Sequence, residues 1–333
     1  MSANDRGTVV HPAATLSGID PERLRVAYEA EAAFDFQRSH VGRPETETIG
    51  YRLRRPVANL VKGSARRWGT LTSSRRAAPD FLLIGAKRAG STTLYRGLVD
   101  SGGIAPMFPA REQRKGVYYF DVHHALGDRW YLGHMPLART VGDQRIGEAS
   151  PYYLSHPHAA ARAAALIPEA RIVVVLRDPI ERAHSHYRER WKQGIEYLPT
   201  FDEAVAAEPG RLDGELEAML ENPRYVSWNH LNFGYLEQSR YATNLGRWYD
   251  VYPSDQILVL RADDLYADPG NVIDEVREFI GLPGAGNVEV THHNKLEPGR
   301  FSAETATRLR DALAPEVRRL EELVGRPMGW PTG

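Results

Sequence analysis

The sequence predicts an α/β fold with a central parallel sheet flanked by helices. From Pro79 onward, short apolar runs alternate with helical patterns, which is typical of a parallel sheet with crossover helices. The strongest run, Arg171–Leu176, is a continuous β-branched stretch that suits a strand covered on both faces. Asp178 and Pro179 follow it as a helix cap and a first helical residue.

The other elements are expected in chain order. A strand at Phe81–Ile84 leads through a glycine-bearing loop into a helix at Thr92–Asp100. Further along we expect strands at Arg145–Glu148 and Gln256–Leu260, and helices at Pro157–Leu166, Val272–Ile280 and Ala303–Val324. Ligands of such folds bind at the carboxyl ends of the strands, so the loops there are the first place to look for a site.

Residues 1–78 differ from the rest, and we predict a basic, helical N-terminal extension there, followed by one domain at 79–333. Asp20–Phe36 has helical spacing of its apolar residues. Arg52–Arg76 is rich in arginine, lacks acids and repeats apolar residues on one helix face. That helix either packs on the main domain with a solvated charged face or binds an anionic acceptor or lipid surface. We do not expect it to bind membranes.

The composition excludes several classes of function. A net charge of −1 argues against a general nucleic-acid binder. The absence of cysteine excludes disulfides, thiolate metal sites and a cysteine nucleophile. No histidines have metal-ligand spacing, so no metal is expected. Because the N-terminus lacks a signal-peptide pattern and no apolar run is long enough to span a membrane, we expect a cytoplasmic protein.

The loop after the first strand has the features of a phosphate site. It reads GAKRAGSTT from Gly85 to Thr93, so small residues and hydroxyls open a helix whose N–H groups face an anion. Gly85 and Gly90 have the spacing of the ATP-binding P-loop, but Ser91 stands where that motif has its lysine. The cations Lys87 and Arg88 lie inside the loop instead. This pattern predicts a 5′-phosphate whose outer group is not a polyphosphate tail.

A second anion site is expected where the long apolar strand ends. Arg177 follows that strand directly, and Ser185 lies on the next helix. An arginine and a hydroxyl placed in this way can bind one phosphate from two sides. On its own, the Arg177 segment could equally be a helix cap with a surface ion pair. Together with the first loop, it predicts a nucleotide with phosphates at both its 5′ and 3′ positions.

Six segments carry a family resemblance: PDFLLIGAKRAGSTTL, KGVYYFD, GEASPYYL, RIVVVLRDPIERAHSHY, SRYATNLGRWYDVYP and ILVLRADDL. They resemble the sulfotransferases that use 3′-phosphoadenosine 5′-phosphosulfate (PAPS), most closely the branch of the heparan sulfate O-sulfotransferases and bacterial relatives. The resemblance runs from about Pro79 to about Trp330. It implies a P-loop-like sheet, PAPS as donor, 3′-phosphoadenosine 5′-phosphate (PAP) as product, and no metal.

The resemblance also implies which residues bind the nucleotide. They are Lys87, Arg88, Ala89, Gly90, Ser91, Thr92, Thr93, Arg177, Ser185, Tyr241 and Arg300. The chain departs from the family near the chemistry. Arg88 stands where the family has a catalytic lysine, Gly116 where the heparan branch has a glutamate base, and Ala149 where it has a lysine. Pro298, two residues before Arg300, also replaces a family lysine.

We predict Arg88, with Lys87 as the second candidate, as the cation that stabilises the leaving oxygen. Asp121 is the predicted general base, since its family counterpart lies in the acceptor cleft; a helix cap or a structural ion pair is its other interpretation. The alternative bases are Glu112, Glu148 and His123. Lys115 either holds the acceptor or donor sulfate or is a solvated lysine.

The predicted function is transfer of the sulfuryl group of PAPS to a hydroxyl of a small-molecule or glycan acceptor. A glycan, a glycolipid or a secondary metabolite would fit. One alternative is an ATP-dependent small-molecule kinase, which Ser91 disfavours. The other is a catalytically idle nucleotide-binding module, which Gly116 and Ala149 leave open.

Overall fold

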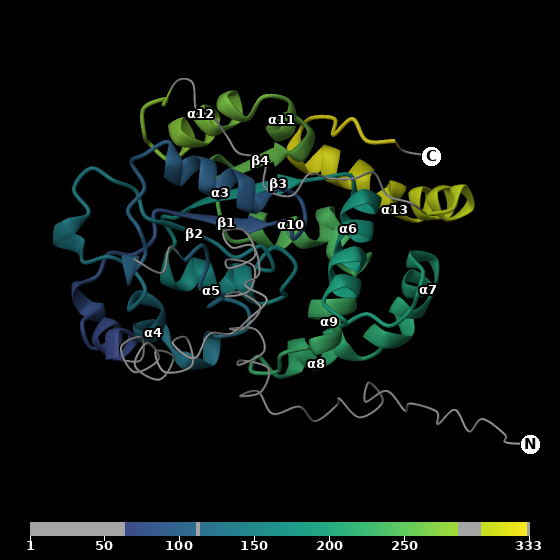
Figure 1. Ribbon diagram of the computed structural model, residues 1–333, viewed down its shortest axis with the longest axis horizontal. Coiled ribbons are helices and arrows are strands. Elements are labelled where there is room, and N and C mark those ends of the chain that lie inside the picture. The colour runs from purple at the N-terminus through teal and green to yellow at the C-terminus, as the bar shows by residue number, and fades with distance from the viewer. Residues whose placement is uncertain (1–63, 111–113, 286–300, 332–333) are drawn as a thin grey trace, which may run out of the picture.

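A four-stranded parallel sheet lies at the centre of the protein (Figure 1). The computed structural model describes residues 64–110, 114–285 and 301–331. The strands stand in the order β2-β1-β3-β4, and every neighbouring pair is parallel. Their bounds are β1 (Phe81–Gly85), β2 (Gly147–Ala149), β3 (Arg171–Leu176) and β4 (Ile257–Arg261). The predicted fold class is confirmed, with the second strand starting later than expected.

Helices cover both faces of the sheet (Figure 1). On one face lie α3 (Ser91–Asp100), α11 (Ala262–Ala267) and α12 (Pro269–Phe279), and on the other α5 (Ala159–Leu166) and α10 (Tyr241–Tyr249). Leu83 and Val173 pack beneath the first group, whereas Ile172 and Val174 pack against the second. Successive residues of a strand point to opposite faces of the sheet. Because helices cover both faces, the residues on each face are apolar, and the strand is one continuous apolar run in the sequence.

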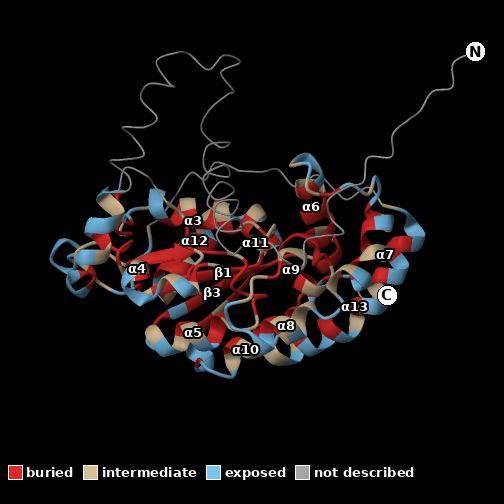
Figure 2. Cartoon of the chain, turned by 90° about the horizontal axis from the view of Figure 1, so that it is seen from below, coloured by how far each residue is buried: buried red, intermediate tan, exposed pale blue. Residues whose placement is uncertain are grey.

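A helical lobe adjoins the carboxyl edge of the sheet (Figure 1). The lobe consists of α6 (Pro179–Lys192), α7 (Phe201–Leu212), α8 (Glu215–Glu221), α9 (Trp228–Phe233) and α13 (Ala303–Val324). The short helix α4 (Asp128–Leu132) is not part of this lobe and lies at the other end of the molecule. Asp178 caps α6, since its Oδ1 accepts from the backbone N of Ile180 and of Glu181 at 2.9 Å each. Figure 2 shows buried residues on the strands and the inner sides of the helices, with exposed residues outside.

The strand order fixes where a ligand can bind. From β1 the chain passes to β2 on one side and then returns to β3 on the other side of β1. At such a switch point the loops after the two central strands diverge and leave a crevice at the carboxyl edge. Here these are the loop after Gly85 and the loop that begins at Arg177.

The N-terminal extension lies mostly outside the described residues, including the helix expected at Asp20–Phe36. Residues 64–71 are helical, so the basic helix expected to reach Arg76 ends earlier, before a 3₁₀ turn at Ser73–Arg75. Arg76 itself is buried, with its guanidinium 4.1 Å from the centre of the Phe108 ring. The end of the predicted extension therefore packs on the main domain.

Candidate active site

The loop between β1 and α3 has a conformation that depends on glycine. Gly90 has φ of 102°, and a Cβ added there would lie 2.9 Å from the Tyr266 hydroxyl. Arg88 also has a positive φ, of 71°. Helix α3 begins directly after the loop, at Ser91, so its free N–H groups face the crevice.

Arg88 connects this loop to helix α6. Its Nε donates to Ser185 Oγ at 3.2 Å, and its Nη1 donates to Glu189 Oε1 at 2.6 Å. The sequence assigned Arg88 and Ser185 to two separate phosphate sites. The structure brings these two predicted sites into direct contact.

Arg177 is buried and has an unused donor. Its Nη2 donates to Glu181 Oε2 at 3.2 Å, whereas its Nη1 has no hydrogen-bond partner among the described residues. Burial lowers the pKa of Arg177 from its ordinary value. Tyr241 fixes the backbone here, because its hydroxyl donates to the Arg177 carbonyl at 2.9 Å. A buried guanidinium N–H without an acceptor suits a phosphate oxygen.

Lys115 lies beside the start of α3. Its Nζ donates to Thr92 Oγ1 at 2.8 Å and to Ser91 Oγ at 3.3 Å. The helix dipole is positive at this end, so the ammonium group and the helix repel each other. An anion bound between them would relieve that repulsion. The structure therefore brings Lys115 to the 5′ loop, and its role in holding a sulfate stays a prediction.

Arg182 is a supporting residue that the sequence analysis missed. Its side chain is fully buried. The Arg182 Nε donates to Ser239 Oγ at 2.7 Å, and the Nη2 donates to the Tyr235 carbonyl. The Nη1 donates to the Lys87 carbonyl at 3.4 Å. It therefore ties the phosphate loop to α6 and to the 235–239 segment. The available signal was the polar stripe of Arg182, His186 and Arg190 at four-residue spacing, which places all three on one face of α6.

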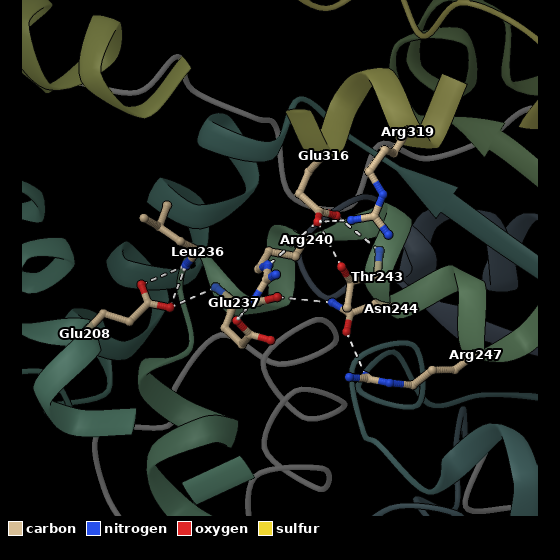
Figure 3. A network of polar contacts seen from close by, with 9 residues as sticks. All are labelled: Glu208, Leu236, Glu237, Arg240, Thr243, Asn244, Arg247, Glu316 and Arg319. Atoms are coloured by element: carbon tan, nitrogen blue, oxygen red, sulfur yellow. Dashed lines mark hydrogen bonds and ion pairs between the residues drawn. The ribbon is translucent and has the colours of Figure 1, made fainter. Parts of the chain in front are cut away.

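A polar network holds residues 236–247, the segment that contains Tyr241 (Figure 3). Glu208 of α7 accepts from the backbone N–H groups of residues 236 and 237, at 2.8 Å in the closest contact with each. Glu316 of α13 accepts from Thr243 Oγ1 at 2.8 Å. These contacts join α7, α10 and α13. They fix the start of α10 and with it Tyr241.

The two positions that depart from the family pattern next to Lys115 do not suit the family's side chains. A Cβ at Gly116 would lie 2.4 Å from the Ala149 carbonyl oxygen and 2.6 Å from Ser150 Oγ, so a base at 116 would require a different local backbone. Ala149 is itself fully buried in the apolar layer that contains Leu94, so a lysine there would place a charge among apolar side chains.

Asp121, the base predicted from the sequence, is a buried carboxyl group. Its Oδ1 accepts from the Val122 backbone N at 2.5 Å, and its Oδ2 has no hydrogen-bond partner among the described residues. Burial, with a smaller contribution from Glu148, raises the pKa of Asp121 to about 8. At neutral pH this side chain is therefore mostly protonated.

We expect Asp121→Asn to stabilise the fold increasingly as pH rises. The pKa of Asp121 is about 8 in the folded protein and about 4 in the unfolded chain. The protonated side chain therefore makes its full contribution to the free energy of unfolding below about pH 4. That contribution is lost as the pH rises through about 8. Asparagine removes this loss. Denaturant unfolding from about pH 5 to about pH 9 measures it; a variant-minus-wild-type difference that does not change with pH would contradict the assigned burial.

The other proposed bases differ in how far the structure describes them. Glu148 is fully buried, and its carboxylate accepts from the Val117 backbone N, Ser150 Oγ and Tyr153 Oη at 2.6, 3.0 and 2.8 Å. His123 is buried and packs edge-on against Trp130. Glu112 lies outside the described residues, as does Arg300, which was predicted to bind the nucleotide.

The structure is an α/β protein with a P-loop-like sheet, and at its carboxyl edge the residues of the two predicted anion sites lie in contact. The family model for the sulfotransferase domain matches residues 78–298, so the chain belongs to the sulfotransferase family. Both the predicted family and the predicted fold are thereby confirmed.

Individual relatives support the assignment. The human bifunctional heparan sulfate N-deacetylase/N-sulfotransferase 3 is 31% identical over 228 residues, which cover 68% of this chain and 24% of that protein. The membrane-associated sulfotransferase kil1 of Dictyostelium discoideum is 23% identical, covering 76% of this chain and 66% of kil1. A solved sulfotransferase structure from Alicyclobacillus acidocaldarius matches with a TM-score of 0.62 and 25% identity, covering 75% of this chain and 97% of that one. The chain spans about a quarter of the length of the heparan sulfate relatives it matches.

Proposed function

We propose that the protein transfers the sulfuryl group of PAPS to a hydroxyl group of a small-molecule or glycan acceptor and releases PAP. The observation that carries this proposal is the contact between Arg88 and Ser185, together with Arg177 Nη1, which has no hydrogen-bond partner among the described residues. The loop after β1 and the loop after β3 thus offer cations to two anionic groups only a short distance apart. A nucleotide with phosphates at its 5′ and 3′ positions carries two such groups.

The proposed reaction is an in-line displacement at sulfur. The acceptor oxygen forms a bond to sulfur while the bond from sulfur to the bridging oxygen of the 5′-phosphate breaks, so negative charge grows on the phosphate side. Arg88, Lys115 and the N-terminus of α3 lie where they can stabilise that charge, with Lys87 next to them. Arg177 and Ser185 would hold the 3′-phosphate and so position the donor.

Ligand-dependent stability separates the candidate functions. PAP at a hundred times its Kd should raise the free energy of unfolding by about 2.7 kcal/mol, and ATP with Mg²⁺ should raise it far less. Thermal unfolding with each ligand measures this. Stronger stabilisation by ATP with Mg²⁺ would favour the kinase. PAP-selective stabilisation without turnover of PAPS on any acceptor would favour the idle module.

The acceptor and the cellular location are open to direct tests. Incubating the protein with labelled PAPS and cell extracts would identify acceptors, because only a sulfated product gains the label. No helix among the described residues is long and apolar enough to cross a membrane. The cytoplasmic location expected from the sequence stays a prediction, which fractionation of cells that express the chain would test.

A further inference from the structure

Glu189 is a carboxylate in direct contact with the cation predicted to act in catalysis. Its Oε1 accepts from Arg88 Nη1 at 2.6 Å, and its Oε2 accepts from Arg190 Nη2 at 3.2 Å. The Glu189 side chain keeps 10% of its surface exposed, beside an Arg88 side chain that is 25% exposed. The carboxylate is therefore largely shielded from water and lies against the predicted donor-site cation.

The charge state of Glu189 suits proton acceptance. Burial alone would raise the pKa of Glu189, but the positive charges of Arg88, Arg190 and Lys87 outweigh burial and hold the pKa below its usual value. The carboxylate is thus ionised at neutral pH. Its position on α6, one turn after Ser185, places it beside both predicted phosphate sites.

The other carboxylates near the site are less suited to this role. Asp121 is mostly protonated at neutral pH, because burial raises its pKa to about 8. Both oxygens of Glu148 already accept hydrogen bonds inside the core. At Gly116 there is no space for any side chain. Among the carboxylates of the described residues considered as bases, Glu189 alone is both ionised and in contact with Arg88.

We propose that Glu189 is the general base of the transfer, with Arg88 as its counter-ion; this rests on the proposed donor site. The acceptor oxygen bonds to sulfur, the bond from sulfur to the bridging oxygen breaks, the acceptor's proton passes to the Glu189 carboxylate, and PAP leaves with the electron pair. As charge grows on the bridging oxygen, the Arg88 guanidinium is drawn from Glu189 toward that oxygen. Glu189 then loses a counter-charge and becomes a stronger base when the acceptor releases its proton.

The test compares acceptors that do and do not need a base. Labelled PAPS is given to wild type and to Glu189→Gln with water alone, with benzyl alcohol, and with 4-nitrophenolate at mildly alkaline pH. We expect the variant to release sulfate to water and to sulfate the alcohol about 10²–10⁴ times more slowly, as for a lost general base. Its rate with the phenolate, which has no proton to lose, should fall far less, by no more than the loss of the Arg88 contact causes. Formate ions should restore part of the sulfate release by Glu189→Ala, an arm that needs only water as the acceptor.

Glu196→Gln is the matched control. Glu196 is buried and pairs with Arg211 at 2.7 Å, so this change also breaks a buried glutamate–arginine pair, outside the donor site. It should lower stability and leave the relative rates on the three acceptors unchanged. PAP binding by wild type and by Glu189→Gln is measured by calorimetry.

Three results would overturn the proposal. One is a Glu189→Gln variant that loses no rate with water or alcohol, or that loses the same factor with all three acceptors. Another is a failure of formate to restore sulfate release by Glu189→Ala. The third is a base-dependent loss in Asp121→Asn in place of Glu189→Gln, which would assign the base to Asp121. If wild type itself fails to bind PAP, the donor site is wrong, and the calorimetry distinguishes this from a wrong base.

Discussion

Arg88→Ala is expected to lower kcat by about 10²–10³ while changing PAP affinity much less. Removing one preorganised donor aimed at developing charge has this effect in other enzymes, because the donor matters more in the transition state than in the ground state. Arg88 is well placed for such a role, since Ser185 and Glu189 fix its guanidinium at the crevice. Turnover of labelled PAPS and calorimetric binding of PAP measure the two quantities separately.

Arg88→Lys is the control for that experiment. The family resemblance places a lysine at this position, so lysine should keep a large part of the rate although it cannot bind Ser185 and Glu189 in the same bidentate way. Turnover by Arg88→Ala at the wild-type rate would remove Arg88 from the mechanism. A loss confined to PAP affinity would make it a binding residue only.

Arg177→Ala is expected to weaken PAP binding strongly and to leave binding of 5′-AMP nearly unchanged. Each charge-assisted hydrogen bond contributes about 1.5–3 kcal/mol, which corresponds to a factor of roughly 10–150 in Kd. 5′-AMP lacks the 3′-phosphate, so it has nothing to lose when the arginine is removed. Calorimetric titration of both nucleotides into wild type and variant gives the four constants.

Arg145→Ala is a suitable comparison for Arg177→Ala. The Arg145 guanidinium donates to the Ile280 carbonyl at 2.9 Å, away from the crevice, so its loss should leave both nucleotide affinities as they are. If Arg177→Ala weakened PAP and 5′-AMP by the same factor, the 3′-phosphate would not lie at Arg177.

Local signals in the sequence were enough to predict the sheet and the ends of several helices. β3 was predicted with its correct bounds because a β-branched run buried on both faces has few other structures available. The start of α6 followed from Asp178 and Pro179, whose capping geometry is local. The bounds of α13, at Ala303–Val324, were also predicted correctly.

Helices α7, α8 and α9 of the lobe were not predicted because their signals are weak or non-local. Helix α7 contains Pro209, which sequence rules treat as a helix breaker, and α8 and α9 are short. The contact between Arg88 and Glu189 joins residues 101 positions apart in the chain, so no local pattern marks it. The 5′ loop and Arg177 could be proposed from the sequence because each directly follows a strand, and Ser185 because it lies on the helix after Arg177. Their roles in binding stay predictions. Glu189 became a candidate only when its contact with Arg88 was known.

A crystal structure of the protein with PAP tests the central claim most directly. The account predicts the 5′-phosphate against the Gly85–Thr93 loop and the 3′-phosphate within hydrogen-bond distance of Arg177 Nη1 and Ser185 Oγ. A nucleotide bound elsewhere, or one whose ribose phosphate lies far from both side chains, would contradict it.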